Sequence, residues 1–414
     1  MIISICYDID VIKVYYNYAT KSSFCCGNAL RKKEVGIGYY RVRNRSITAT
    51  LSIDYKKMEE QDYEKKFLSA LLLCCMVLTL LPTAALAAGD VAIDYTNFPD
   101  SGFRGYVKEK FDKDNDGSLS ADEIAKVTNI SVAKDSLRSL EGIEHFTALE
   151  TLFVGGPITA LDLSKNTELT FIDFSHTKLT TLDTSHNTKL RTLSCNETPS
   201  LTSLNVSGNT ELRFLYCKQN ALTDLDLTNN LKLEKLECGG NEFTTLDLSK
   251  NTSLKYFGFV NSKLSSLDLT NNTNLEELHS FGNNFSTLDV SKNTKLKILR
   301  VFSNKLISLD TSKNKDLQTL EVHDNPLTSM YLGDNSGSTI EVKFDNNPYP
   351  ITVPTATRTF NLSQLTGFDV SKAHEWENGT VNGNILTVDE NATTVTYAYD
   401  CGERQAKYGT PTMT

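Results

Sequence analysis

The chain has 414 residues, 39% of them hydrophobic and 22% charged, so it can bury a large core, and a disordered or collagen-like chain is excluded. Low contents of Gly (22) and Pro (9) and a single Trp favour a repetitive core built from Leu. The net charge of −9 is uneven: Lys and Arg outnumber Asp and Glu by six over residues 1–57 and trail by two over residues 58–87, which leaves residues 88–414 at −13. That acidity argues against nucleic acid or an anionic membrane as the main partner and favours cation binding.

Residues 58–87 have the pattern of a secretory signal peptide. Lys65 and Lys66 precede an apolar run that ends at Pro82, and Ala85-Leu86-Ala87 matches the small-residue pattern of a cleavage site. The apolar run is shorter than the ~20 residues that a membrane-spanning helix needs, so an uncleaved membrane anchor is the weaker alternative. We therefore expect an exported protein.

The position of this signal sets the expected start of the mature chain. Signal peptides begin near the start of translation, and Met58 stands just before the basic pair. We interpret residues 1–57 as upstream sequence from a start codon placed too early. Because no L-P-x-T-G sorting motif or apolar tail precedes Thr414, we expect free secretion, or association with a surface through the C-terminal β module.

Most of the remaining chain is a repeat with a period of 21 or 22 residues. Its first half has the form L-D-L-S, and its second half reads L-x-x-L-x-C/V-x-x-N. A period of this length with this Leu spacing is typical of a leucine-rich-repeat solenoid. One coil cannot bury its own Leu face, whereas stacked coils form a continuous Leu core and a parallel sheet. The first halves begin at Leu161, Leu182, Leu204, Leu225, Leu246, Leu267, Leu288 and Leu309.

We predict about eleven coils within residues 127–350. Two series of Asn, one on each side of the coil, are expected to satisfy buried backbone groups of the turns. Cys195, Cys217 and Cys238 take an inward position that Val fills in later coils, which favours small buried hydrophobes over a metal or redox site. A row of Asp after the Leu of the first half favours turn capping, with weak cation binding as the alternative.

The positions beside the inward residues of each strand are expected to face the concave side, where solenoids of this kind generally present their ligand surface. Large aromatics there form an exposed strip that exceeds what solubility requires, and such clusters tend to mark protein or sugar contacts. The alternative is that these residues merely suit strands. The predicted ligand-binding residues are Phe171, Phe214, Tyr216, Tyr256, His279, Phe281, Arg300 and Phe302.

A candidate metal site precedes the coils, within residues 88–126. Residues 112–123 carry carboxylates at loop positions 1, 3 and 5, Gly at position 6 and Glu at position 12, between an expected entering helix from about residue 100 and a short exiting helix over 121–126. These are the oxygen-ligand spacings of an EF-hand calcium loop. Because the loop has no paired partner, we interpret it as an EF-hand-like clasp that caps the coils and not as a sensor. The predicted calcium ligands are Asp112, Asp114, Asp116, Ser118, Ser120 and Glu123.

Residues 351–414 predict a small β module after the repeats. Residues 380–388 and 393–399 alternate apolar and polar side chains at period two, with an Asn-Gly turn between the halves of the first segment. We expect Trp376 to pack inside this module, with a sugar-stacking platform as the alternative. The expected fold class is therefore a mainly β, α/β-type solenoid: a leucine-rich-repeat horseshoe with a parallel sheet, a short helical cap and a small C-terminal β module.

These motifs together resemble those of a known class of proteins. The run Phe98-Pro-Asp-Ser-Gly-Phe103, the loop at 112–123, the coil pattern and residues 368–376 are similar to secreted leucine-rich-repeat proteins of Gram-positive gut anaerobes, which are loosely internalin-like. The resemblance covers roughly residues 93–400. It implies a secreted or surface binding protein whose concave face grips a partner, which is an analogy from fold and export.

The sequence favours a non-enzymatic function. Apart from His374, the histidines lie on cap or repeat positions, without a phosphate loop, an H-E-x-x-H motif or a nucleophile elbow around them. A thiol pair of Cys401 with His374 is the weak enzymatic alternative. The predicted function is recognition of a protein or glycan for adhesion or contact with host or cell surfaces, with calcium stabilising the cap. The alternatives are a structural spacer of a cell-surface layer and an inhibitor of a secreted enzyme.

Overall fold

The computed structural model describes residues 90–133, 135–333, 341–343 and 349–402, and elsewhere only the backbone of short strands. The chain divides into two compact units, Met1–Ala85 and Leu86–Thr414. The signal peptide that we predict over residues 58–87 lies outside the described residues. Within the described ranges, no helix is long and apolar enough to cross a membrane.

The first unit, as far as it is described, consists of antiparallel strand pairs. These are β1 (Ile3–Asp8) with β2 (Val11–Tyr16), β3 (Val35–Gly36) with β6 (Thr50–Leu51), and β4 (Tyr40–Val42) with β5 (Arg45–Ile47).

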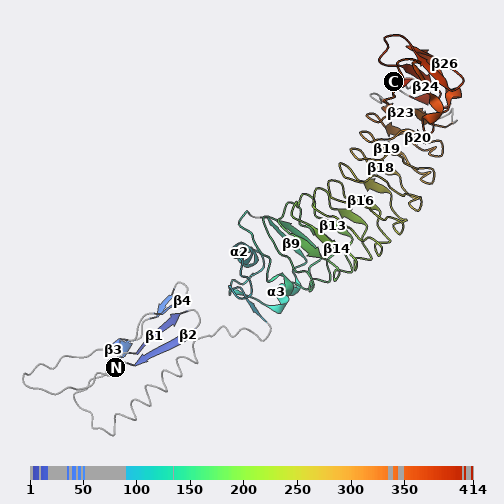
Figure 1. Ribbon diagram of the computed structural model, residues 1–414. Helices are drawn as coiled ribbons and strands as arrows, with labels where there is room; N and C mark the ends of the chain where they lie inside the picture. Colours follow the sequence, from blue (N-terminus) through green and yellow to red (C-terminus); the bar gives the residue numbers. More distant parts are fainter. Residues whose placement is uncertain are drawn as a thin grey trace, which may run out of the picture. The chain divides into compact units, whose positions relative to one another are not determined.

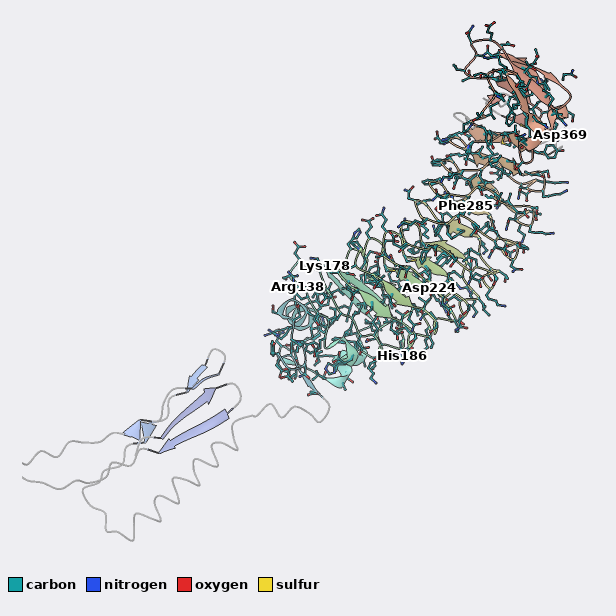
Figure 2. The ribbon with its side chains drawn as sticks, in the orientation of Figure 1. Arg138, Lys178, His186, Asp224, Phe285 and Asp369 are labelled. Atoms are coloured by element: carbon teal, nitrogen blue, oxygen red, sulfur yellow. The ribbon has the colours of Figure 1, made fainter. Side chains whose placement is uncertain are left out.

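The second unit begins with a small cap that contains two helices. The cap consists of β7 (Val91–Ala92), α2 (Ser101–Lys110), β8 (Ser118–Leu119) and α3 (Ala121–Ala125). Asp100 caps α2 because its Oδ1 accepts hydrogen bonds from the backbone N–H groups of Gly102 and Phe103. Its Oδ2 accepts the backbone N–H of Arg138 at 2.8 Å, which ties the helix to the segment after the first strand of the coils (Figure 2). The two helices lie where the sequence predicts them.

Beyond the cap, the chain forms a solenoid of stacked coils (Figure 1). Each coil contributes one short strand to a single parallel sheet, so the predicted fold class of a mainly β solenoid is confirmed. Short strands also pair on the opposite side of some coils, β12 (Thr181–Asp183) with β14 (Ser203–Asn205) and β20 (Ser308–Asp310) with β22 (Ser329–Tyr331). The long sheet runs through β9 (Asn129–Ala133), β10 (Thr151–Gly155), β11 (Phe171–Asp173), β13 (Thr192–Ser194), β15 (Phe214–Tyr216), β16 (Lys235–Glu237), β17 (Tyr256–Gly258), β18 (Glu277–His279), β19 (Ile298–Arg300), β21 (Thr319–Glu321), β23 (Thr339–Lys343) and β29 (Gln405–Ala406).

The register of this sheet places the repeated Leu in one column. Leu193 pairs with Leu215, and Leu215 pairs with Leu236 in the next coil. All three side chains are fully buried. Since side chains of a strand alternate between its two faces, the residues on either side of each Leu must point outward. The Leu period therefore determines which residues form the core and which residues point outward from the sheet.

Two ladders of buried Asn hold neighbouring coils together, as the sequence predicts. In the ladder after the sheet strands, Asn241 donates from Nδ2 to the carbonyls of Cys217 and Cys238, and its Oδ1 accepts the N–H of Leu222. In the ladder on the other side, Asn272 donates from Nδ2 to the carbonyls of Leu248 and Asn251. The full sets are Asn220, Asn241, Asn283, Asn304 and Asn325, and Asn166, Asn187, Asn209, Asn230, Asn251, Asn272, Asn293 and Asn314.

The C-terminal segment packs directly on the last coils. It contains β24 (Thr359–Asn361), β25 (Ala373–Glu377), β26 (Gly379–Asn382), β27 (Ile385–Val388), β28 (Thr396–Tyr399) and β30 (Thr412–Met413). The Tyr397 hydroxyl donates to the Thr328 carbonyl at 2.8 Å, and the Leu332 N–H donates to the Cys401 carbonyl at 2.6 Å. The Trp376 ring stacks on Tyr397 with centroids 4.6 Å apart. Tyr397, Tyr399 and Cys401 therefore belong to the core of the solenoid, whereas a second core inside the segment consists of Leu362, Leu365, Leu386 and Val388.

Candidate functional site

The acidic loop between the two cap helices is folded around its own carboxylates. Gly117 has φ of +92°, and its N–H donates to Asp112 Oδ2 at 3.2 Å, so the sharp turn at loop position 6 needs the glycine. The backbone N–H and the hydroxyl of Ser118 both donate to Asp116 Oδ1 at 2.7 Å. Carboxylate oxygens of Asp112, Asp114 and Asp116 lie within 4.8 Å of one another. The loop thus gathers three acidic groups at one point.

Asp112 shows how this loop fits a cation. The residue is only 3% exposed, and its Oδ1 is buried without a hydrogen-bond partner. A buried, unpartnered carboxylate oxygen is costly unless a cation or a donor satisfies it. Calcium takes six to eight oxygen ligands of this kind, so the donor set of the loop fits calcium better than a softer metal.

Glu123, at loop position 12, closes the loop. Its Oε1 accepts the N–H of Lys113 at 2.7 Å, and its Oε2 accepts the N–H and the hydroxyl of Ser120, both at 2.9 Å. Burial opposes ionisation of Glu123, but these hydrogen bonds outweigh it and lower the pKa of the carboxyl. Ser120 in turn caps α3, and the pair forms a capping box.

The acidic loop is joined to the core of the solenoid through β8. Leu119, at loop position 8, is fully buried in the core that includes the coils. β8 pairs antiparallel with β7, and the Ile93 N–H donates to the Gly117 carbonyl at 2.9 Å. In paired EF-hand loops, the strand of one loop pairs with the strand of the other. Here β7 takes that place beside β8. Order in the loop and order in the cap are coupled by these contacts.

The row of Asp residues on the coils has a structural role. Each carboxylate accepts the backbone N–H of the Ser or Thr two residues later, at 2.8–2.9 Å. This is the turn capping that the sequence predicts. In the described ranges, a group of three acidic, His or Cys side chains close enough together to hold one metal ion occurs at Asp112, Asp114 and Asp116, and not along this row. The row consists of Asp162, Asp183, Asp226, Asp247, Asp268, Asp289 and Asp310.

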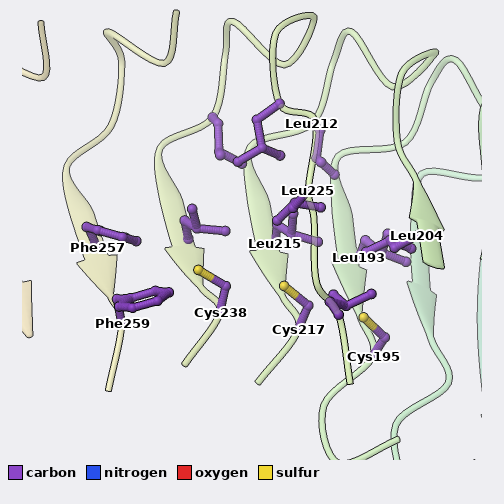
Figure 3. Close-up of a cluster of buried hydrophobic side chains, with 14 of the residues drawn as sticks. Leu193, Cys195, Leu204, Leu212, Leu215, Cys217, Leu225, Cys238, Phe257 and Phe259 are labelled. Atoms are coloured by element: carbon purple, nitrogen blue, oxygen red, sulfur yellow. The ribbon is translucent and has the colours of Figure 1, made fainter. Parts of the chain in front are cut away.

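The cysteines of the coils are buried packing residues. Cys195, Cys217 and Cys238 are fully buried and free, and they stack in register below the Leu column (Figure 3). Burial raises the pKa of the Cys217 thiol to about 12. A thiol that is buried and protonated is a poor nucleophile and a poor metal ligand, which agrees with the packing role predicted from the sequence.

The aromatic residues predicted on the concave side lie on the outer sheet face. We define this face as the outward side chains of the long-sheet strands from β9 to β23 and of the residues just after these strands. All six side chains are partly exposed, which is less exposure than the sequence predicts for this strip. Rings of neighbouring coils cover two of them: Phe281 and Phe302 stack with centroids 4.3 Å apart, and Phe302 also stacks on His323 at 4.5 Å. Coils spaced like strands bring equivalent side chains into contact, which sequence spacing alone does not reveal.

A chain of polar contacts runs beside these rings. Lys235 Nζ lies 4.0 Å from the centroid of the Tyr256 ring, and Tyr256 stacks on His279 at 5.0 Å. Arg300 Nη1 lies 3.4 Å from His279 Nδ1, and Arg300 Nε lies 3.2 Å from Glu321 Oε1. Burial lowers the pKa of His279, against the opposing effect of the hydrogen bond between its Nε2 and the accepting Oε2 of Glu277. Five predicted ligand-binding residues thus belong to two networks: Phe281 and Phe302 to the stacked rings, and Tyr256, His279 and Arg300 to the chain of polar contacts.

Phe171 and Phe214 lie on earlier strands of the same face. Phe171 packs against Phe153, with ring centroids 4.7 Å apart. Phe153 was missed by the sequence analysis, although it is 40% exposed and the coil beginning at Leu149 carries the same spacing as the others. Its signal is its place directly after the inward Leu152, the position of Tyr216 after Leu215.

No model of a known protein family matches the chain, and no curated protein matches it. Similar solved structures include the functional domain of InlJ from Listeria monocytogenes, which includes a cysteine ladder; it is 21% identical, with 80% of this chain and 98% of that chain covered and a TM-score of 0.40. An internalin C2 from the same species is 20% identical, with coverage of 62% and 98% and a TM-score of 0.41. An internalin InlF from that species is 24% identical, with coverage of 60% and 93% and a TM-score of 0.38. At this level of similarity, no partner or activity of these proteins is assigned to this chain.

Proposed function

We propose that the protein is an exported, non-enzymatic binding protein that recognises a macromolecular partner with its outer sheet face, in adhesion or contact with a host or cell surface. The observation that carries the proposal is the pair of side-chain networks around Tyr256, His279, Arg300 and Phe302. Aromatic and Arg side chains are the residues that most often dominate binding energy. Because neighbours in adjacent coils already hold these side chains, a partner that contacts them would lose little affinity to side-chain ordering.

The proposal includes calcium as a stabiliser of the cap. Asp112, Asp114, Asp116, the Ser118 carbonyl, Ser120 and Glu123 would supply oxygen ligands around one ion. The buried, unpartnered Oδ1 of Asp112 supports this role. A calcium ion there would stabilise the folded chain by mass action, because the unfolded loop would not hold the ligands together. Export, predicted from residues 58–87, would place the loop where calcium is abundant.

The test is a binding screen of the full chain, in calcium, against host glycans, extracellular-matrix proteins and peptidoglycan. A double variant, Tyr256→Ala with Arg300→Ala, should weaken saturable binding by more than about tenfold, as expected for central interface residues. The matched control is Tyr95→Ala, which removes a 75% exposed Tyr of the cap, outside the coils. Both proteins must melt at the temperature of the parent chain.

The outcomes separate the alternatives. Loss of binding in the double variant but not in the control would support the sheet face as the working surface. Unchanged binding in a folded double variant would refute it. Failure to bind any member of the panel would favour a structural spacer of a cell-surface layer.

A further inference from the structure

The outer sheet face changes character along the axis of the coils. Backbone hydrogen bonds continue past the strand ends, from Glu197 N–H to the Lys218 carbonyl at 2.9 Å and from Gly282 N–H to the Phe302 carbonyl at 3.2 Å. Each strand has an outward residue on either side of its inward Leu or equivalent residue. The hydrogen bonds align the residue two positions after the second of these into one row along the coils, which we name the third row. From first coil to last it reads Ala133, Gly155, Ser175, Asn196, Lys218, Gly239, Val260, Phe281, Phe302 and His323.

The third row explains where the sheet face is hollow. Over the first coils it has small or polar side chains, whereas its later members include the stacked rings of Phe281, Phe302 and His323. A hollow of about 410 Å³ lies over the first five coils. This volume falls in the range of about 300–1,000 Å³ that is usual for small-ligand sites. Its lining includes Phe153, Asp173, Ser175, Ser194, Asn196 and Lys218.

Hydrogen bonds hold the polar lining in place. Asp173 Oδ1 accepts the N–H and the hydroxyl of Ser175, at 3.0 and 2.7 Å. The Ser175 and Ser194 hydroxyl oxygens are 3.0 Å apart, and Asn196 Oδ1 accepts the Lys218 N–H at 2.9 Å. The carboxylate accepts hydrogen bonds, and the amide and hydroxyl groups both donate and accept, so together they can pair with neighbouring hydroxyl groups of a ligand.

The two basic side chains of the lining each lie beside a carboxylate, and Asp173 adds an acidic group. Lys218 Nζ lies 2.7 Å from Glu237 Oε2, and His176 Nδ1 lies 3.4 Å from Glu197 Oε2. A phosphate, sulfate or carboxylate ligand would have to break one of these pairs to obtain a cation. An uncharged ligand would leave both intact. The lining therefore favours a neutral ligand over an anion.

One wall of the hollow is aromatic. Phe153 lines it and is 40% exposed, one of few large apolar side chains with that exposure in the described ranges. The C–H face of a sugar ring packs on such a side chain while its hydroxyl groups reach polar neighbours. An extended peptide that adds to a sheet would instead need a free strand edge; under the hollow, β9 is the edge strand, whereas β10, β11, β13 and β15 pair on both sides within the sheet.

We propose that this hollow binds a short neutral oligosaccharide. The proposal rests on the proposed function, because it assigns a ligand class to the N-terminal part of the same sheet face. Phe153 is the aromatic wall, and Asp173, Ser194 and Asn196 are the hydrogen-bonding groups for sugar hydroxyls. The region around Tyr256 and Phe302 remains the contact surface for the larger partner.

The probe is an array of defined neutral and anionic oligosaccharides, followed by titration calorimetry of the full chain, in calcium, with the neutral glycan that gives the highest signal. Phe153→Ala should weaken the binding by more than about tenfold, as for an anchoring aromatic. Asn196→Phe should abolish it, because this variant places in the hollow the residue that the third row carries at Phe281. The matched control Tyr95→Ala, which removes an exposed aromatic side chain of the cap that does not line the hollow, should bind the glycan like the parent.

The controls make the two proposals separable. Absence of neutral glycans among the bound probes, or glycan binding that persists in a folded Asn196→Phe variant, would overturn the oligosaccharide site. Binding of anionic glycans alone would also overturn it. If the oligosaccharide site fails while Tyr256→Ala with Arg300→Ala still abolishes partner binding, the proposed function stands without it. Failure of the proposed function would show instead as partner binding that resists the Tyr256 and Arg300 substitutions.

Discussion

The two Asn ladders should differ in the stability that each loses on substitution, although both are buried and both donate two hydrogen bonds. Asn241→Ala leaves the Leu222 N–H and the Cys238 carbonyl without a partner, since each bonds only to the Asn241 side chain. The Cys217 carbonyl keeps the hydrogen bond from Asn220. The change therefore leaves two buried backbone groups unpaired.

Asn272→Ala has a milder expected effect. The Leu248 carbonyl still accepts the Asn251 N–H, and the Asn251 carbonyl still accepts the Leu254 N–H. In addition, the Oδ1 of Asn272 is buried without a partner, so its removal relieves a desolvation cost. No backbone group loses its last hydrogen bond.

The magnitude follows from these partners. A buried unpaired polar group costs about 1–3 kcal/mol. The two backbone groups that Asn241→Ala leaves unpaired should therefore lower the free energy of unfolding by about 4 kcal/mol. Asn272→Ala should lower it by about 1–2 kcal/mol, mainly through the lost volume and the weaker bonding of two carbonyls. The two variants remove the same atoms from the same kind of interior, so each serves as the control for the other.

Urea unfolding followed by far-UV circular dichroism, in saturating calcium, measures the difference. The midpoint for Asn241→Ala should fall well below that for Asn272→Ala, with similar slopes. If a coil stack unfolds in stages, the transition that contains these coils is the one to compare. An equal loss in both variants, or a larger loss for Asn272→Ala, would refute the hydrogen-bond accounting.

Three further results are expected. Removing calcium with EDTA should lower the melting temperature. The loss corresponds to about 2.7 kcal/mol if the calcium concentration is about 100 times the dissociation constant. Asp112→Asn should abolish this calcium dependence, whereas Asp122→Asn, which changes an exposed acidic neighbour in α3, should keep it. Burial lowers the pKa of His279 against the effect of Glu277, so folding favours the neutral ring and stability should fall as pH drops below about 6.5, the unfolded value; His279→Gln should flatten this part of a plot of melting temperature against pH. Cys217→Val should cost less than about 1.5 kcal/mol, because Val fills the equivalent position in later coils, and the Cys217 thiol should react with a thiol reagent only on unfolding.

Each of these has a result that contradicts it. A melting temperature that is identical with and without calcium would remove the clasp. A pH dependence unchanged by His279→Gln would place the titrating group elsewhere. Fast labelling of Cys217 in the folded chain would show that the coil opens locally, against its burial.

The sequence was sufficient for the coils because their period repeats a single physical requirement. Each coil must present its Leu column inward, so a step of 21 or 22 residues fixes the register of a long parallel sheet. The same argument predicted the two Asn ladders, the buried cysteines and the Asp turn caps. The acidic loop could be recognised because its ligand spacing lies within twelve consecutive residues, which local geometry folds together.

The properties of the outer sheet face were decided by the tertiary structure. Spacing along the chain shows which side chains point outward, but the exposure of Phe281 or Phe302 depends on the neighbour one coil away, about 21 residues distant in sequence. For this reason the six aromatic side chains are less exposed than the sequence predicts, and the hollow over the first coils was not foreseen. The packing of the C-terminal segment on the last coils likewise depends on contacts such as Tyr397 with Thr328, between residues that no local pattern relates. A repeat determines which side chains face inward, whereas the surface properties depend on contacts between coils, which only the folded stack brings together.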